Sequence, residues 1–575
     1  MISGKSTFRE SPRKEGRCHT PDYLRRRRNL ILKTVAIFFT FILALRYITS
    51  HLSSGVTKTT FESVRYNGST VGSADESPKS NLPIKEASTL EMTIQTQRPL
   101  SDDRELKEAL HQVFKLLPSK SGMKNLLSPI QGTGEVKLRE TGIRAKKFKS
   151  LFEAWEKLHL VAEARDEVSF RTDIIQELIQ NTPSKHIAIT IDRYERYRIF
   201  LEEFAALLFP YIITGSDASD STSLDAQMSL HAKIHKGGRG IVLSGGNRQA
   251  PFLLTSIPSL RNLGCNLPIE IMYLGDGDLS PENRAKLEKL DGVVTRDIKV
   301  RDEGWKLAGW AGKPFAILLS SFREVIFIDA DSLFFKNPEV LFEDQSYKRT
   351  GALFFKDRVL FPENKQKWLK QILPEPISQS VKDSRFWAGT SGHMQESGVV
   401  VVDKWRHFVS MLMVTRMNGP DRDGDKSKGI KGIYDMVYGD KETFWLGWEL
   451  VGDLDYAFHQ GDVGVMGQLT KQDPKQAQHF EICAPQLLHL DVEGNPLWFN
   501  GWILMNKFEE DVAKRQAGTF TNYIREKPTS KHQWQLKHNN NACLAADSSF
   551  MFTPAEKGAL EFIMTEAKAT GAYKK

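Results

Sequence analysis

The 575-residue chain has only four cysteines: Cys18, Cys265, Cys483 and Cys543. So few cysteines exclude a disulfide-dense scaffold, and no CxxC pair is present to bind a structural zinc ion. Cys18 precedes the one long apolar run of the chain, so three cysteines follow it. At least one of those three therefore cannot form a disulfide within the chain.

The chain also lacks a basic face in most of its length, although its formal net charge is +8 at pH 7. Residues 1–28 hold nine Lys and Arg and three acidic residues, so the other 547 residues share a net charge of only +2. Nucleic-acid binding needs clustered positive charge. The sequence therefore predicts no nucleic-acid partner.

The one long apolar run follows the basic end, in the stretch RRRRNLILKTVAIFFTFILALRYI that begins at Arg25. Residues 29–50 are just long enough to cross a bilayer. Arginines on the N-terminal side place a cytosolic tail at 1–28 and everything after the anchor on the other side of the membrane. A cleaved signal peptide is the alternative. The small residues at Ser53–Gly55 support it, and the long basic leader disfavours it.

Two further regions separate this anchor from the rest of the chain. Residues 51–100 are rich in Ser, Thr, Glu, Lys and Pro, which is typical of a flexible stem. The stem contains the glycosylation sequon Asn67-Gly-Ser. Residues 101–235 carry apolar side chains at three- and four-residue spacing, so we expect a helical region there.

From residue 236 to residue 510, short β-branched runs alternate with helical stretches. This alternation predicts an α/β fold, a mainly parallel sheet flanked by helices. Ligands of such sheets bind outside the carboxyl ends of the strands. The glycine turn Gly245-Gly246-Asn247 and the segment Asp329–Asp331 are expected at that edge. Residues 511–575 are polar and lysine-rich, and we predict a C-terminal extension without an assigned role.

Asp329 and Asp331 follow the apolar run Val325–Ile328 in EVIFIDADSLFF. Side chains two residues apart on a strand point the same way, so both carboxylates face one side. Two carboxylates at a strand end suit Mn²⁺ or Mg²⁺, which in turn neutralises a diphosphate. The alternative is a surface turn that happens to be rich in aspartate.

Five segments, taken in order, resemble the fungal Golgi α-1,3-mannosyltransferases, glycosyltransferase family 71 of the GT-A type. They are GRGIVLSGGN, LRNLGCNLPIEIMYLGDGD, REVIFIDADSLFFKNPEVLFE, GHMQESGVVVVDK and YGDKETFWLGWEL. The third is also similar to the metal-binding segment of glycogenin-like enzymes. The resemblance covers about residues 236–505 and implies a Rossmann-like GT-A fold, a GDP-mannose donor and a Golgi membrane location.

The same resemblance implies a ligand set. Asp329 and Asp331 match the motif that holds Mn²⁺ against the diphosphate of GDP, and His489 matches a late histidine that completes the metal site. A core histidine is the alternative for His489. Lys313 matches a lysine that reaches the nucleotide sugar, together with the backbone of Gly245, Gly246 and Asn247; a solvated helix lysine and an ordinary turn are the alternatives. A lysine expected after the histidine is missing, because Asn495–Leu497 stands there.

Three acids are candidates for the chemistry. Transfer from GDP-α-mannose into an α-linkage retains the anomeric configuration, which requires a nucleophile below the sugar or a front-face departure. We expect Asp440 or Glu396 below the sugar ring and Glu442 at the acceptor hydroxyls; helix N-terminal acids or salt-bridge partners are the alternatives. Tryptophans that are candidates for stacking on sugars, or otherwise for the core, are Trp387, Trp445 and Trp448.

The sequence is thus interpreted as a single-pass type II Golgi membrane enzyme with a lumenal catalytic domain. It is expected to move mannose from GDP-mannose to terminal mannose of N- or O-linked glycans, forming an α-1,3 linkage. An α-1,2-mannosyltransferase of the same superfamily is the nearest alternative. A catalytically inactive GT-A fold that serves as a lectin-like or scaffold subunit is the alternative from another class.

Overall fold

A computed structural model describes residues 103–163, 167–171, 174–212, 226–299, 305, 307–470, 480–506, 508–527, 534–537 and 541–573. The predicted cytosolic tail, membrane anchor and stem, with Asn67, lie outside these described residues. Within them, none of the helices combines the length and the apolar character needed to cross a membrane.

A seven-stranded sheet forms the centre of the molecule, with the order β10-β8-β9-β6-β3-β4-β5. All neighbours are parallel except β9, which runs antiparallel to both β6 and β8. The strands are β3 (Arg239–Ser244), β4 (Ile269–Tyr273), β5 (Val293–Asp297), β6 (Glu324–Asp329), β8 (Ala352–Lys356), β9 (Gln395–Asp403) and β10 (Ala457–Phe458). The predicted mainly parallel sheet flanked by helices is confirmed.

Both faces of this sheet are buried, because alternate side chains of each strand enter two different cores. Val325 and Phe327 of β6 belong to one core, together with helices α10, α15 and α16. Ile326 and Ile328 belong to the other, together with α8, α17 and a second sheet. Apolar runs such as Val325–Ile328 are therefore uninterrupted, since neither face meets water.

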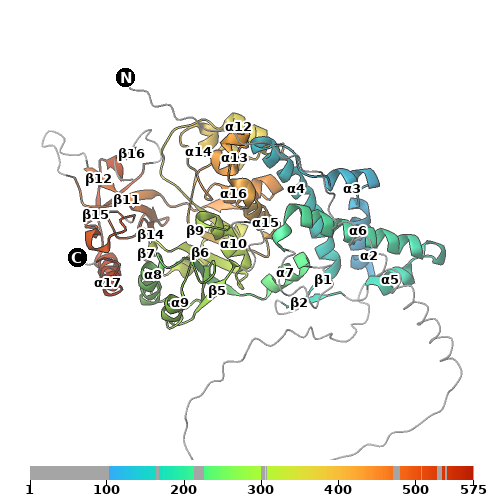
Figure 1. Ribbon diagram of the computed structural model, residues 1–575, viewed down its shortest axis with the longest axis horizontal. Helices are drawn as coiled ribbons and strands as arrows, with labels where there is room; N and C mark the ends of the chain where they lie inside the picture. The colour runs from blue at the N-terminus through green and yellow to red at the C-terminus, as the bar shows by residue number, and fades with distance from the viewer. Residues whose placement is uncertain are drawn as a thin grey trace, which may run out of the picture. The chain divides into compact units, whose positions relative to one another are not determined.

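The helices around the sheet are short, as is usual for α/β connections (Figure 1). They are α8 (Ala250–Asn262), α9 (Pro281–Leu287), α10 (Gly312–Leu319), α11 (Gln345–Thr350), α12 (Gln366–Ile372), α13 (Gln379–Lys382), α14 (Arg385–Ala388), α15 (Phe408–Met417) and α16 (Thr443–Val451). The 3₁₀ turn η6 (Gly309–Ala311) leads directly into α10. Ser280 begins α9 as an N-cap whose side chain accepts a hydrogen bond from the Asn283 N–H, as the Ser-Pro start signal predicts.

The region before residue 236 is mainly helical where it is described (Figure 1). It contains α2 (Asp103–Leu116), α3 (Lys120–Leu126), α4 (Gly134–His159), α5 (Ile174–Asn181), α6 (Ile187–Leu208) and α7 (Ala226–His235), with the hairpin β1 (Leu160–Glu163) and β2 (Glu167–Phe170). Helix α4 packs against α12 and α16, and its Phe148, Phe152 and Trp155 join the first core. The helical region thus shares a core with the sheet.

A second, antiparallel sheet has the order β18-β15-β11-β13-β14-β7. Its strands are β7 (Ser332–Phe334), β11 (Val463–Gly467), β13 (Leu487–Leu490), β14 (Pro496–Asn500), β15 (Asn522–Arg525) and β18 (Phe550–Met551). Strand β7 begins directly after Asp331, so the chain passes from the central sheet into this one at the two aspartates. The backbone carbonyl of Asp331 accepts hydrogen bonds from the N–H groups of Gly501 (3.2 Å) and Trp502 (2.9 Å).

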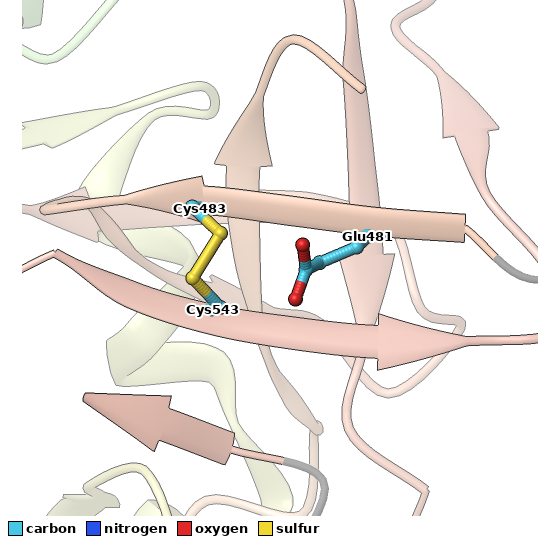
Figure 2. Close-up of side chains that lie close together, drawn as sticks. All are labelled: Glu481, Cys483 and Cys543. Carbon is cyan, nitrogen blue, oxygen red and sulfur yellow. A yellow bond between two sulfur atoms is a disulfide. The ribbon is translucent and has the colours of Figure 1, made fainter. Parts of the chain in front are cut away.

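The chain after residue 510 is integrated with the sheets. It supplies β15 and β18 to the second sheet, and α17 (Pro554–Ala569) packs against α8. A third sheet joins β12 (Phe480–Ala484), β17 (Ala542–Ala546) and β16 (Trp534–Leu536). Cys483 and Cys543 face each other across β12 and β17 and form a disulfide (Figure 2), which leaves Cys265 buried as a free thiol.

Candidate functional site

Several of the predicted site residues lie at one edge of the central sheet. Strands β3 and β6 end there, at Ser244 and Asp329. Because β9 runs the opposite way, its first residues lie at this same edge, with Glu396 opposite Phe355 of β8. The topology therefore gathers the ends of three strands and the start of a fourth, as expected for a ligand site of an α/β sheet.

Lys313 binds two of the predicted acids. Its ammonium lies 2.7 Å from Oδ2 of Asp329 and 3.5 Å from Oδ2 of Asp440. The hydroxyl of Ser397 accepts a hydrogen bond from Lys313 (3.1 Å) and donates one to Asp440 Oδ2 (3.0 Å). Lys313 is buried in the first turn of α10, so the alternative of a solvated helix lysine does not describe it.

Opposite and like charges compete in this cluster. Burial alone would lower the pKa of Lys313, but Asp329 and Asp440 outweigh it and raise the pKa above its usual value. Burial raises the pKa of Asp329 to about 7; Lys313 opposes this shift, and Asp331 and Asp440 add to it. A second cation close to Asp329 would relieve this like-charge repulsion.

A second ion pair, which sequence reasoning missed, lies along the same edge. Lys441 Nζ is 2.5 Å from Oδ2 of Asp357, the residue directly after β8. Burial alone would raise the pKa of Asp357, but Lys441 and Arg358 hold it below its usual range. The only sequence signal for this pair was the position of Asp357 at the carboxyl end of a predicted strand.

Glu396 and Glu442 occupy different environments. Glu396 Oε1 accepts hydrogen bonds from Asn500 Nδ2 and from the Gly398 N–H, both at 2.8 Å. Burial, with a contribution from Asp357, raises the pKa of Glu396. Glu396 therefore lies at the strand edge, where the second sheet meets the first.

Glu442 is fully buried, and polar groups of the protein use both of its oxygens. The N–H of Met394 donates to Oε1 (2.8 Å) and the indole of Trp445 donates to Oε2 (2.7 Å). Burial raises the pKa of Glu442 to about 7. The Glu442 carboxylate thus lies in the core, where it holds the backbone just before β9. It is not at an open surface where acceptor hydroxyls could reach it.

His489 is not brought together with the two aspartates. It lies on β13 opposite Trp498 of β14, and Trp498 lies opposite Phe334 of β7. His489 is thus two strands away from β7, or roughly 10 Å, with the Trp498 ring stacked on it at 3.9 Å between centroids. Its neighbours are aromatic, and burial lowers its pKa well below the usual value.

We expect that His489→Phe leaves the metal requirement of the protein unchanged. A second aromatic ring preserves the stack on Trp498 and removes both ring nitrogens, so the Mn²⁺ concentration for half-maximal activity should change by less than about twofold. Titrating Mn²⁺ against activity in the purified variant checks this. An increase of ten-fold or more would instead make His489 a ligand, as the resemblance implied.

The glycine turn fits closely against a neighbouring loop. A side chain at Gly246 would meet Oδ1 of Asp278 at 2.2 Å, so only glycine fits. The Asn247 N–H donates to the Asp278 carbonyl (2.7 Å), and its side chain accepts from Asn283 (2.8 Å). Gly246 and Asn247 therefore contact the protein itself, as in an ordinary turn, and this turn lies at the edge of the site.

The three tryptophans proposed as stacking platforms lie mostly in the core. Trp445 and Trp448 of α16 are fully buried, and Trp448 donates to Nδ1 of His407 at 3.1 Å. Trp387 on α14 is half-buried and packs against the first core. Every residue of α16 is buried, so its two tryptophan rings pack inside the protein and offer no face to a sugar.

The two aspartates fit a divalent cation of the magnesium or manganese type. Such ions are held by one or two carboxylates together with waters and substrate phosphates, rather than by a full protein cage. Asp329 and Asp331 supply that many oxygens at the exit of β6, and both are partly exposed. Elsewhere in the described chain, the one close group of three potential ligands is Glu481, Cys483 and Cys543. Figure 2 shows that its two sulfurs are bonded to each other, so it holds no metal.

The segment that contains these residues is similar to known proteins. Residues 238–491 match the mannosyltransferase family model Mannosyl_trans3. The α-1,3-mannosyltransferase MNT2 of Saccharomyces cerevisiae is 28% identical over 328 residues, which are 50% of this chain and 56% of that protein. MNN14 of Candida albicans, named for the same activity, is 31% identical over 321 residues, or 48% of this chain and 44% of that protein. The sequence resemblance to fungal α-1,3-mannosyltransferases is confirmed.

The chain spans about half the length of the curated relatives it matches. Among solved structures, the galactosyltransferase LgtC in complex with donor and acceptor sugar analogues is 15% identical. The match covers 38% of this chain and 73% of that one with a TM-score of 0.25, a similarity too weak to carry an argument.

Proposed function

We propose that this protein, whose residues 238–491 match a mannosyltransferase family model, transfers mannose from GDP-mannose to a terminal mannose of an N- or O-linked glycan. The linkage formed would be α-1,3, the activity for which the matched yeast relatives are named. The observation that carries the proposal is the Lys313–Asp329–Asp440 cluster beside Asp331, at the sheet edge within the matched segment. The fold would be of the GT-A type.

Asp329 and Asp331 are the residues that would hold Mn²⁺. The bound ion would supply charge neutralisation for the diphosphate of the donor. The second cation of the site is Lys313, which is fixed by Asp329, Asp440 and Ser397 and cannot move freely. A pre-oriented ammonium stabilises the negative charge that develops on a leaving diphosphate more effectively than a mobile one.

Retention of the anomeric configuration needs a group that stabilises positive charge on the sugar. Asp440 and Glu396 are the partly or fully buried acids at this edge, and each is held in place by hydrogen bonds from the protein. We assign to one of them the place below the sugar ring, where a fixed carboxylate favours an oxocarbenium-like transition state. An oxygen of the leaving phosphate would then accept the proton of the acceptor hydroxyl.

We place the protein in the Golgi membrane as a single-pass type II enzyme with its catalytic part in the lumen. The support for this is the sequence of residues 1–50, with its basic end and apolar run. A disulfide between Cys483 and Cys543 agrees with an oxidising compartment.

The donor is tested with the purified full-length protein in detergent. We expect GDP-mannose to be used at least about 100-fold better than UDP-glucose or UDP-galactose, because a site built for one nucleotide leaves polar groups unpaired with another. Mannobiose is the acceptor in this assay. EDTA should abolish the activity, and added Mn²⁺ should restore it. Linkage analysis of the product distinguishes α-1,3 from α-1,2. Transfer from a UDP-sugar alone, or full activity in EDTA, would reject the proposed donor or the metal.

A further inference from the structure

Four aromatic rings from four separate loops meet beside the proposed site. Trp310 lies in η6, Phe361 in the loop after β8, His393 just before β9 and Tyr438 just before α16. The side chains of Trp310, Phe361 and Tyr438 are 55%, 55% and 63% exposed, whereas large aromatic side chains are normally buried. We call these four residues the aromatic ledge.

The rings of the ledge form a connected row. Trp310 and Tyr438 lie 5.8 Å apart between centroids, Tyr438 and His393 5.6 Å, and His393 and Phe361 5.5 Å. These are ordinary aromatic contact distances, so the rings support one another without being covered. A row of exposed rings spanning several loops offers more surface than a single sugar needs.

Two glycines and a positive φ angle allow the backbone to pass close to the rings of the ledge. Gly439 has a φ of +64°, and a side chain there would meet the Trp310 ring at 3.0 Å. A side chain at Gly392 would meet the carbonyl oxygen of Phe361 at 2.9 Å. Phe361 itself has a φ of +53°, a conformation that costs a bulky residue of order 1–3 kcal/mol. Such strain is found mainly where a side chain must be held in a particular place for function.

The ledge is continuous with the proposed site. The Lys441 ammonium lies 5.2 Å from the centroid of the Tyr438 ring and 2.5 Å from the Asp357 carboxylate. Tyr438 precedes Asp440 by two residues, and Trp310 precedes Lys313 by three. A sugar chain bound on Trp310 and Tyr438 would therefore lie next to the acids and lysines of the sheet edge.

We propose that the aromatic ledge binds the acceptor oligosaccharide by stacking of sugar rings on Trp310, Tyr438 and Phe361. Sugar rings present apolar C–H faces and a polar rim, which matches flat aromatic faces bordered by polar groups. The Lys441–Asp357 pair, whose ammonium lies against the Tyr438 ring, provides that border. The inference rests on the proposed function, because it takes the ligand from that reaction.

The test measures the acceptor and the donor separately. In full-length protein, Trp310→Ala and Tyr438→Ala should each raise the KM for mannotriose about tenfold or more, with the KM for GDP-mannose changed less than twofold. Trp310→Phe and Tyr438→Phe keep a flat ring and should restore most of the acceptor affinity. Ile189→Ala is the matched control, since Ile189 is also apolar and 58% exposed but lies on α6 of the helical region. It should leave both constants unchanged.

Donor hydrolysis without acceptor separates this inference from the proposed function. A wild-type protein that neither hydrolyses nor transfers from GDP-mannose would overturn the proposed function. If the wild type transfers and the alanine variants keep the wild-type acceptor KM, the ledge does not bind the acceptor and the function stands. A tenfold rise in the KM for both substrates, with a lower melting temperature, would also overturn the ledge, because it would show a structural role.

Discussion

Asp331→Ala should reduce transfer by at least about 1000-fold while the protein still folds normally. The loss follows from the loss of one of two carboxylates that hold a divalent cation against a diphosphate, a contribution of several kcal/mol to transition-state stabilisation. The side chain of Asp331 is partly exposed, and the backbone carbonyl that fixes the loop to Gly501 and Trp502 is kept in the variant. Initial rates at saturating GDP-mannose, with Mn²⁺ varied over several decades, measure the effect.

The control for Asp331→Ala is an acid of similar charge away from the site. Asp455 is exposed and forms a surface ion pair with Arg406, so Asp455→Ala should leave the rate within about twofold of wild type. Melting temperatures of both variants should lie close to that of the wild type. An Asp331→Ala variant that keeps more than a tenth of the wild-type rate would be incompatible with a metal held at this strand exit.

The position of the aspartate pair followed from local sequence. An unbroken apolar run identifies a strand buried on both faces, and its end must lie at the sheet edge where parallel strands end together. Side-chain alternation then places Asp329 and Asp331 on one side. All of these steps use residues adjacent in sequence, which is why they were predictable from the chain itself.

Partners distant in sequence were not predictable in this way. Lys441 and Asp357 are 84 residues apart in the chain and meet at the edge where β8 ends and β9 begins. The sequence predicted a mainly parallel sheet and contained no signal that β9 is reversed. Glu442 looked like an acid beside a pocket, but the Met394 N–H and the Trp445 indole engage it in the core. A buried carboxylate that receives neutral donors has the same sequence appearance as a catalytic one.

The aromatic residues that form the exposed surface were also not predictable from the sequence. From the sequence, Trp445 and Trp448 were candidates either for sugar stacking or for the core, and both lie buried on α16. The exposed rings at Trp310 and Tyr438 come from loops more than 100 residues apart, and no periodic pattern marks them. Periodicity detects faces of regular elements, whereas a ligand surface made of loops depends on the tertiary arrangement.

Lys313→Met should have the largest effect on stability of the single substitutions at the site. Lys313 neutralises Asp329 and Asp440, whose side chains are 19% and 5% exposed. Removal of one partner from a buried ion pair leaves uncompensated charge and costs about 3–5 kcal/mol. The same substitution removes the fixed cation at the proposed diphosphate position, so kcat should fall about 100-fold or more. Denaturant unfolding and initial rates measure the two effects.

The stability deficit of Lys313→Met should depend on pH. Lys313 opposes the rise that burial causes in the pKa of Asp329, so without Lys313 this pKa lies still further above its unfolded value, and the folded protein holds a proton that the unfolded chain releases. The deficit in the free energy of unfolding relative to wild type should therefore be larger at pH 8 than at pH 5. Burial already raises the pKa of Asp329 to about 7 when Lys313 is present, so the difference should develop across neutral pH.

A second buried lysine separates loss of charge pairing from loss of a buried side chain. Lys404 donates to the carbonyl and the hydroxyl of Ser320, both at 2.8 Å, and no acid lies within ion-pair distance of it among the described residues. Lys404→Met should also lower stability, by about 1–3 kcal/mol. Burial lowers the pKa of Lys404 to about 7, so the deficit of this variant should also grow from pH 5 to pH 8. The rate separates the two variants, because Lys404→Met should leave kcat and the KM for GDP-mannose unchanged. Lys313→Arg keeps the positive charge and should recover part of the stability. If Lys404→Met lowers kcat as much as Lys313→Met does, the ion pair of Lys313 with the two acids has no separate role, and the proposed cation at the leaving diphosphate must be sought elsewhere.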